Sequence, residues 1–175
     1  LKGINQEKMA KAQQKKYAII KGYRDQLENK YQWCIAAVPG KVWAKKVFPG
    51  LSVDEAVEKL WQAILYTSRA EGDGVEAWRK HNAELKSRCE YLNGLGIESL
   101  HYTASNGTDL HVGMIPEAQF CGGAESSLQG IVFNPNIPSE EIFTSPMRGR
   151  AEGIVYSTRP LSYRGVMIEN FSVRF

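Results

Sequence analysis

The chain has 175 residues, of which 43% are hydrophobic, enough for one ordinary domain or two small ones with a real core. Its longest apolar run, around Ile35 to Val38, is far shorter than the roughly 20 residues of a membrane-spanning helix, so no membrane partner is expected. The net charge is +3, and three dispersed cysteines without a C-x-x-C pair argue against a disulfide framework and a structural zinc site, which favours a reducing cytoplasm.

The first predicted element is an amphipathic helix from Asn5 to about Asn29. Residues 1 to 30 carry eight Lys or Arg against three acids, so this segment holds a local excess of positive charge. Such a helix could contact nucleic acid or an acidic partner. Mixed Lys, Gln and Glu is more typical of a solvated face, so we expect no nucleic-acid partner. The apolar residues that define the helix are Met9, Ala12, Ile19, Ile20, Tyr23 and Leu27.

Further elements follow in order up to residue 97. Residues 31–39 indicate a buried strand that ends at Pro39, and a short helix is expected over 43–47, before Pro49. Ser52 and Glu55 have the spacing of a capping box, which predicts a helix to about Arg69. Its expected buried stripe is Ala56, Leu60, Ala63, Ile64 and Thr67.

A second helix start is indicated by Asp73 with Glu76, and the helix should close at Gly94 and Gly96. We expect it to form a hairpin with the preceding helix. The apolar residues of this second helix are Val75, Trp78, Leu85, Cys89, Leu92 and Leu95.

After residue 97 the helical periodicity gives way to short alternating runs separated by Gly, Pro and Asn. The economical prediction is a mixed α+β fold, with a helical first part that includes a short strand and a β-rich second part. Strands are expected near 98–103, 108–114, 130–133, 141–144, 151–157 and 166–175.

Residues that could carry chemistry are few, since neither a G-x-S-x-G elbow nor a phosphate-binding loop is present. Asp109 and His111 lie two apart on a predicted strand, hence on one face, and His101 is close in sequence. Histidine with carboxylate suits Zn²⁺, Co²⁺ or Mn²⁺. The spacing is generic, and a hydrogen-bonded histidine on a strand is the alternative.

Glu140 and Glu141 open the segment EEIFTSP, at residues 140–146. Consecutive strand residues point to opposite faces, so both acids can serve one site only if the strand bulges. We therefore expect at most one to be functional and the other to face solvent. Two glutamates at an exposed strand start remain the structural alternative.

Several motifs together resemble one family, the thermophilic aminopeptidases, which include aminopeptidase T, aminopeptidase S and PepS. The resemblance runs in the same order over essentially the whole chain. Its motifs are PGKVWAKKVFP (39–49), EAVEKLWQAI (55–64), LHYTASNGTDLHVG (100–113), NPNIPSEEIFTSP (134–146) and RPLSYRGVMIENFSVRF (159–175).

The resemblance implies a cytoplasmic, usually dimeric, two-domain exopeptidase that removes N-terminal amino acids from peptides with two divalent metals, Zn²⁺ or Co²⁺. Two such ions about 3.5–4 Å apart can activate a bridging water and stabilise the oxyanion. It implies Glu141 as one metal ligand, with Glu140 as the alternative. It also implies that residues 1–105 belong to the N-terminal domain and 106–175 to the start of the catalytic domain.

Family members are about twice as long or longer, and this chain opens with LKGIN, without Met or a secretory leader. We therefore expect a segment of a longer enzyme whose remaining ligands and general base follow Phe175. No catalytic residue is assigned within this chain, and substrate-binding residues are not identified. Alone, the chain should bind metal weakly and be inactive. The alternative is a non-catalytic binding or assembly domain.

Overall fold

A computed structural model describes residues 5–163 and 166–175 and confirms the mixed α+β class. The chain divides into two compact units that interleave along the sequence. The first takes in residues 5–28, 96–118 and 145–175, apart from 164–165, and the second takes in 29–95 and 119–144. The expected domain division at residue 105 concerns a longer protein and stays a prediction.

The first unit contains α1 (Gln6–Leu27) and a four-stranded antiparallel sheet. The Asn5 side chain caps α1 by accepting a hydrogen bond from the Lys8 amide at 2.9 Å, which confirms the predicted start. The apolar stripe of α1 is largely uncovered, with Ile19 72% and Tyr23 70% exposed. No helix in the described part of the chain is long and apolar enough to cross a membrane.

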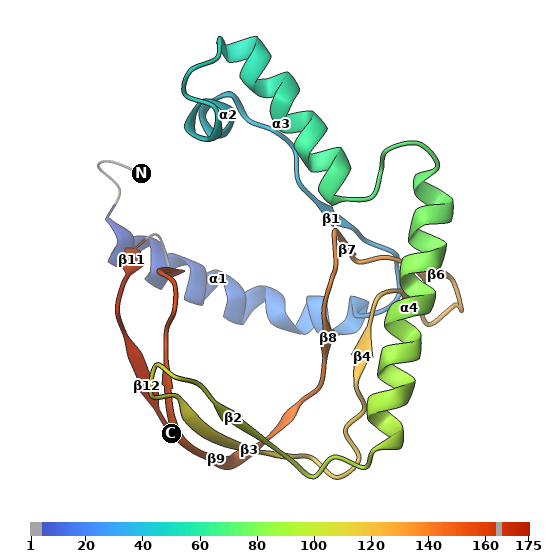
Figure 1. Ribbon diagram of the computed structural model, residues 1–175, viewed down its shortest axis with the longest axis vertical. Helices are drawn as coiled ribbons and strands as arrows, with labels where there is room; N and C mark the ends of the chain where they lie inside the picture. Colours follow the sequence, from blue (N-terminus) through green and yellow to red (C-terminus); the bar gives the residue numbers. More distant parts are fainter. Residues whose placement is uncertain (1–4, 164–165) are drawn as a thin grey trace. The chain divides into compact units, whose positions relative to one another are not determined.

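The sheet of the first unit has the strand order β12–β9–β3–β2, as Figure 1 shows. Gly153 permits the close pairing of β3 with β9, because a Cβ there would clash with the Asp109 carbonyl oxygen. The strands of this unit are β2 (Ser99–Thr103), β3 (Asp109–Met114), β9 (Pro146–Tyr156), β12 (Ser172–Arg174) and the separate hairpin β10 (Leu161–Tyr163) with β11 (Val166–Ile168).

The helices of the second unit are α2 (Lys41–Val47), α3 (Val53–Thr67) and α4 (Gly74–Gly94). The capping box at the start of α3 is present as predicted. The expected hairpin of α3 with α4 is wrong, because α3 packs against α2 instead (Figure 1). Their shared core consists of Ala44, Ala56, Leu60 and Ile64. Ala63 and Thr67, which were expected in the buried stripe, are exposed.

The third helix of this unit, α4, packs on short strands. Trp78, Leu85 and Cys89 are buried as expected, whereas Val75 is 74% and Leu95 54% exposed. The short strands are β1 (Ile35–Ala36), β4 (Cys121–Gly122), β5 (Glu125–Ser126), β6 (Val132–Phe133), β7 (Asn136–Ile137) and β8 (Ile142–Phe143).

The expectation of a buried strand over 31–39 is wrong. Only Ile35 and Ala36 form a strand, β1, and Ile35 is 64% exposed. The physical reason is that β1 pairs with a single neighbour, β7, in a parallel two-stranded sheet. An apolar, β-prone run is therefore not covered on both faces.

Candidate functional site

The two adjacent acids lie between short strands of the second unit. β7 ends three residues before Glu140, and β8 begins directly after Glu141. β7 pairs with β1, and β8 pairs antiparallel with β4, so the segment is anchored on both sides. Both acids therefore precede the strand, which is one residue shorter at this end than predicted.

Glu140 is paired with Arg69, which lies two residues after the end of α3. Its Oε2 accepts a hydrogen bond from Arg69 Nη2 at 3.0 Å, and its Oε1 accepts a second from Arg69 Nη1. His81 Nε2 lies 3.7 Å from the same Oε2. The hydrogen bonds from Arg69 are the main cause that holds the pKa of Glu140 below its usual range. With Glu141 as the implied ligand, Glu140 was the acid expected to face solvent. It is exposed, as expected, but its carboxylate is also paired with Arg69.

Glu141 has different surroundings. Its side chain is exposed, and its carboxylate makes no hydrogen bond or ion pair with any residue in 5–163 or 166–175. Its carbonyl oxygen lies against Gly122, where a Cβ would be only 2.6 Å away. The backbone of Glu141 is therefore fixed against β4, while its carboxylate is available to a ligand from outside the described residues.

Two side chains of α4, His81 and Trp78, support the segment that contains Glu140 and Glu141. His81 is 6% exposed and donates from Nε2 to the Ser139 carbonyl oxygen at 2.7 Å. Trp78 meets the His81 ring edge-on at 5.4 Å and donates from Nε1 to the Ser68 carbonyl oxygen at 2.7 Å. Sequence reasoning missed Arg69 and His81, because no local pattern links them to residues 71 and 58 positions further on.

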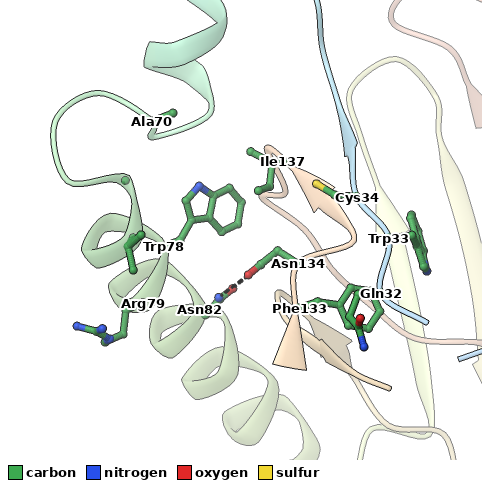
Figure 2. Close-up of a pocket in the computed structure, with 12 residues that line it drawn as sticks. Gln32, Trp33, Cys34, Ala70, Trp78, Arg79, Asn82, Phe133, Asn134 and Ile137 are labelled. Atoms are coloured by element: carbon green, nitrogen blue, oxygen red, sulfur yellow. Dashed lines mark hydrogen bonds between the residues drawn. The ribbon is translucent and has the colours of Figure 1, made fainter. Parts of the chain in front are cut away.

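A cavity of about 880 Å³ opens beside the same elements of the second unit (Figure 2). Asn82 and Asn134 line it and are joined by two reciprocal amide hydrogen bonds of 3.0 Å each. Its walls are mostly aromatic and apolar, which suits an apolar side chain better than a metal ion. The apolar residues of its lining include Trp33, Val75, Trp78, Phe133 and Ile137.

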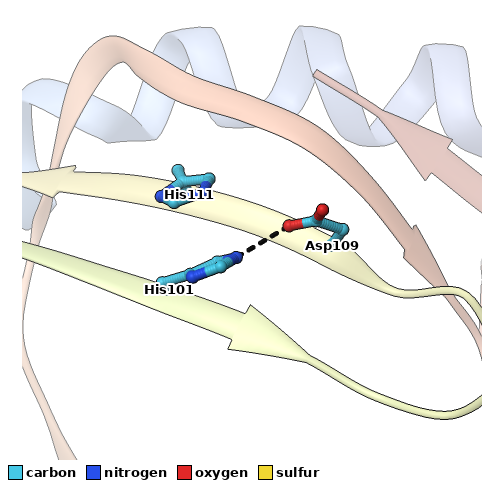
Figure 3. A group of neighbouring side chains, drawn as sticks. All are labelled: His101, Asp109 and His111. Carbon is cyan, nitrogen blue, oxygen red and sulfur yellow. Dashed lines mark hydrogen bonds and ion pairs between the residues drawn. The ribbon is translucent and has the colours of Figure 1, made fainter.

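The second predicted cluster lies in the first unit, and the structure brings its three members together (Figure 3). His101 Nε2 is 2.7 Å from Asp109 Oδ1, and the His101 and His111 rings stack with centroids 3.7 Å apart. The prediction that Asp109 and His111 share one face is confirmed. Glu140 and Glu141 belong to the other unit.

Comparison with known proteins defines the class of this chain. Residues 1–175 match the family described as "Thermophilic metalloprotease (M29)". Aminopeptidase T of Thermus aquaticus is 40% identical over 180 residues, covering 100% of this chain and 43% of that protein. Aminopeptidase PepS of Streptococcus thermophilus is 46% identical over 149 residues, covering 84% of this chain and 36% of that protein.

A solved structure agrees with these relatives. The wild-type AmpT structure from Thermus thermophilus superposes with a TM-score of 0.84 at 37% identity, covering 100% of this chain and 43% of that one. The class is therefore that of metal-dependent peptidases. The chain belongs to the thermophilic metalloprotease family, as the resemblance predicted. It spans less than half the length of these relatives.

Proposed function

We propose that this chain is part of a metal-dependent aminopeptidase that removes N-terminal amino acids from peptides with two divalent ions, Zn²⁺ or Co²⁺. Membership of a metalloprotease family and relatives named as aminopeptidases support the proposal. The proposed parent enzyme is cytoplasmic and homodimeric, with residues 1–105 in its N-terminal domain and 106–175 opening its catalytic domain.

The observation that carries the proposal within this chain is the contrast between the two acids. Glu140 is already neutralised by Arg69, while the carboxylate of Glu141 has no partner among the described residues. A divalent metal needs an anionic oxygen that is free to coordinate it, so Glu141 fits the donor chemistry and Glu140 does not. When bound, the metal pair would supply an activated water and stabilise the developing oxyanion.

The residues around Glu141 position its carboxylate. The Arg69–Glu140 pair and the hydrogen bond from His81 to Ser139 fix the chain just before it, and β4 fixes its backbone. This support matters because a ligand held rigidly loses less entropy when it coordinates. One carboxylate alone would hold a metal weakly, so we assign the other ligands and the general base to sequence outside this chain.

The test compares two variants of the longer protein that contains this chain. Glu141→Ala should lower bound metal and peptide hydrolysis together, by tenfold or more. Glu140→Ala should lower metal content far less, because its carboxylate is engaged by Arg69 and acts only by helping to position Glu141. Metal content is measured by elemental analysis after dialysis, and hydrolysis by release of N-terminal amino acids. Equal losses of metal in the two variants would overturn the assignment of Glu141.

A further inference from the structure

The cluster of His101, Asp109 and His111 lies on one exposed face of the first unit's sheet. In the β2–β3 pair, His101 is directly opposite His111, and residues opposite each other in an antiparallel pair project from the same face. Asp109 precedes His111 by two positions on β3, so it projects from that face too. One ligand atom from each of the three residues lies within 4.8 Å of the others.

A second acid, Glu152, is placed on the same face by the neighbouring strand β9. In the β3–β9 pair, His111 is directly opposite Glu152, and the Glu152 side chain is exposed. His101, His111 and Glu152 therefore form one row across three strands. The sheet backbone holds this row firmly, because hydrogen-bonded strands fix the spacing of their Cα atoms.

We infer that this face binds one Zn²⁺ ion through His101, His111 and Asp109. Two imidazole nitrogens and one carboxylate oxygen are the donors that Zn²⁺ takes in three-ligand sites, with water or another acid as the fourth ligand. Glu152, opposite His111 on β9, would supply that fourth ligand after a change of rotamer, because its carboxylate lies outside the present group. The inference does not rest on the proposed peptidase function, since Glu141 is not among these ligands.

The contacts that the three residues make now show what must change when Zn²⁺ binds. His101 Nε2 donates a hydrogen bond to Asp109 Oδ1 at 2.7 Å. Zn²⁺ takes a neutral imidazole, so coordination through Nε2 requires proton exchange with solvent that leaves the ring proton on Nδ1. Ligand atoms around a tetrahedral Zn²⁺ lie roughly 3.3–3.5 Å apart, given bonds of about 2.0–2.1 Å. The rings of His101 and His111 must therefore turn inward, and their exposure leaves them room to do so.

The simple alternative is a hydrogen-bonded histidine pair without a metal, and Zn²⁺ titration of the full-length protein decides between them. Bound Zn²⁺ per chain is measured after equilibrium dialysis. The His101→Ala and His111→Ala double variant should bind one Zn²⁺ per chain fewer than the unaltered protein. Mg²⁺ in place of Zn²⁺ should show no such difference, because Mg²⁺ prefers oxygen ligands in octahedral geometry.

Two further variants keep the test decisive if the double variant is damaged. Tyr102→Ala removes a half-exposed side chain from the opposite face of β2 and should leave Zn²⁺ binding unchanged. Asp109→His supplies a third imidazole and should tighten binding at this site by about tenfold, a gain that misfolding cannot produce. Unchanged Zn²⁺ content in the double variant, or no gain in Asp109→His, would overturn the inference.

Discussion

At the scale of single residues, Glu140 and Glu141 show how two identical side chains acquire different chemistry. The guanidinium of Arg69 engages both oxygens of Glu140, and this contact also raises the pKa of Arg69. Glu141 meets no such partner in residues 5–163 and 166–175. Ionic partners, rather than sequence position, therefore decide which acid is available to a metal.

The Arg69–Glu140 pair should make stability depend on pH. The pKa of folded Glu140 is lowered, so its contribution is fully present above the unfolded pKa of about 4.3 and is lost as pH falls through the folded pKa. Glu140→Gln should cost about 0.5–1 kcal/mol at pH 7, a modest value because the pair is partly exposed to solvent. Chemical unfolding of the chain at a series of pH values measures this difference.

Glu141→Gln is the matched control for that experiment. Because the Glu141 carboxylate lacks a partner in the described residues, its substitution should change stability little at any pH in the absence of metal. A cost for Glu140→Gln that is as large at pH 3 as at pH 7 would contradict the ion-pair account.

At the scale of elements, the start of α3 is a local device whose value can be measured. The Ser52 hydroxyl accepts from the Glu55 amide at 3.3 Å, and Glu55 accepts from the Ser52 amide at 2.9 Å. The hydrogen bond from the Ser52 side chain is the main cause that lowers the pKa of Glu55. Ser52→Ala should cost about 1 kcal/mol of unfolding free energy. Val53→Ala, whose side chain takes no part in the two capping hydrogen bonds, is the comparison. An equal cost in both variants would contradict a stabilising role of the cap.

The contact of α4 with β4 depends on Leu85, the side chain with the deepest burial on this helix at 1% exposure. Leu85 also lies against Gly123, whose positive φ of 77° favours glycine. Leu85→Ala should lower the free energy of unfolding by about 2–5 kcal/mol, because it leaves a cavity. Leu95→Ala, 54% exposed, should cost far less. Similar midpoints in denaturant for the two variants would refute this placement of the core.

These elements also show why prediction succeeded in part. The ends of α3 and α4 follow from caps and periodicity, which act within a few residues, so the sequence reveals them. The partner of α3 depends on which surface is covered in three dimensions, and the expected hairpin was therefore wrong. β1 pairs with β7 about 100 residues later, a choice that alternation alone does not encode.

The candidate sites were also predictable only in part. Asp109 and His111 share a strand, so their common face was predictable, and His101 joins them across a hairpin of nearby residues. Arg69 and His81 reach the segment of Glu140 through long-range packing and carry no local signal. The assignment of Glu141 to a metal came from resemblance to a family and stays a proposal.

At the scale of the whole molecule, the two units each hold one part of the possible metal chemistry. The second unit carries Glu141, and the first carries the cluster of His101, Asp109 and His111. The relatives that the chain matches are more than twice as long. A peptidase centre with two metals needs several ligands held together, whereas one carboxylate binds a divalent ion weakly.

The 175-residue chain by itself should therefore fail to hydrolyse peptides. With Zn²⁺ or Co²⁺ added, release of N-terminal amino acids should stay at the rate of the buffer with metal alone. The longer parent protein, assayed beside it, should turn over the same peptide and lose activity with a chelator. Zn²⁺ binding by the isolated chain at His101 and His111 would not contradict this, because the prediction concerns peptide hydrolysis and not metal binding. Turnover by the isolated chain that Glu141→Ala abolishes would show that the essential ligands lie within residues 1–175.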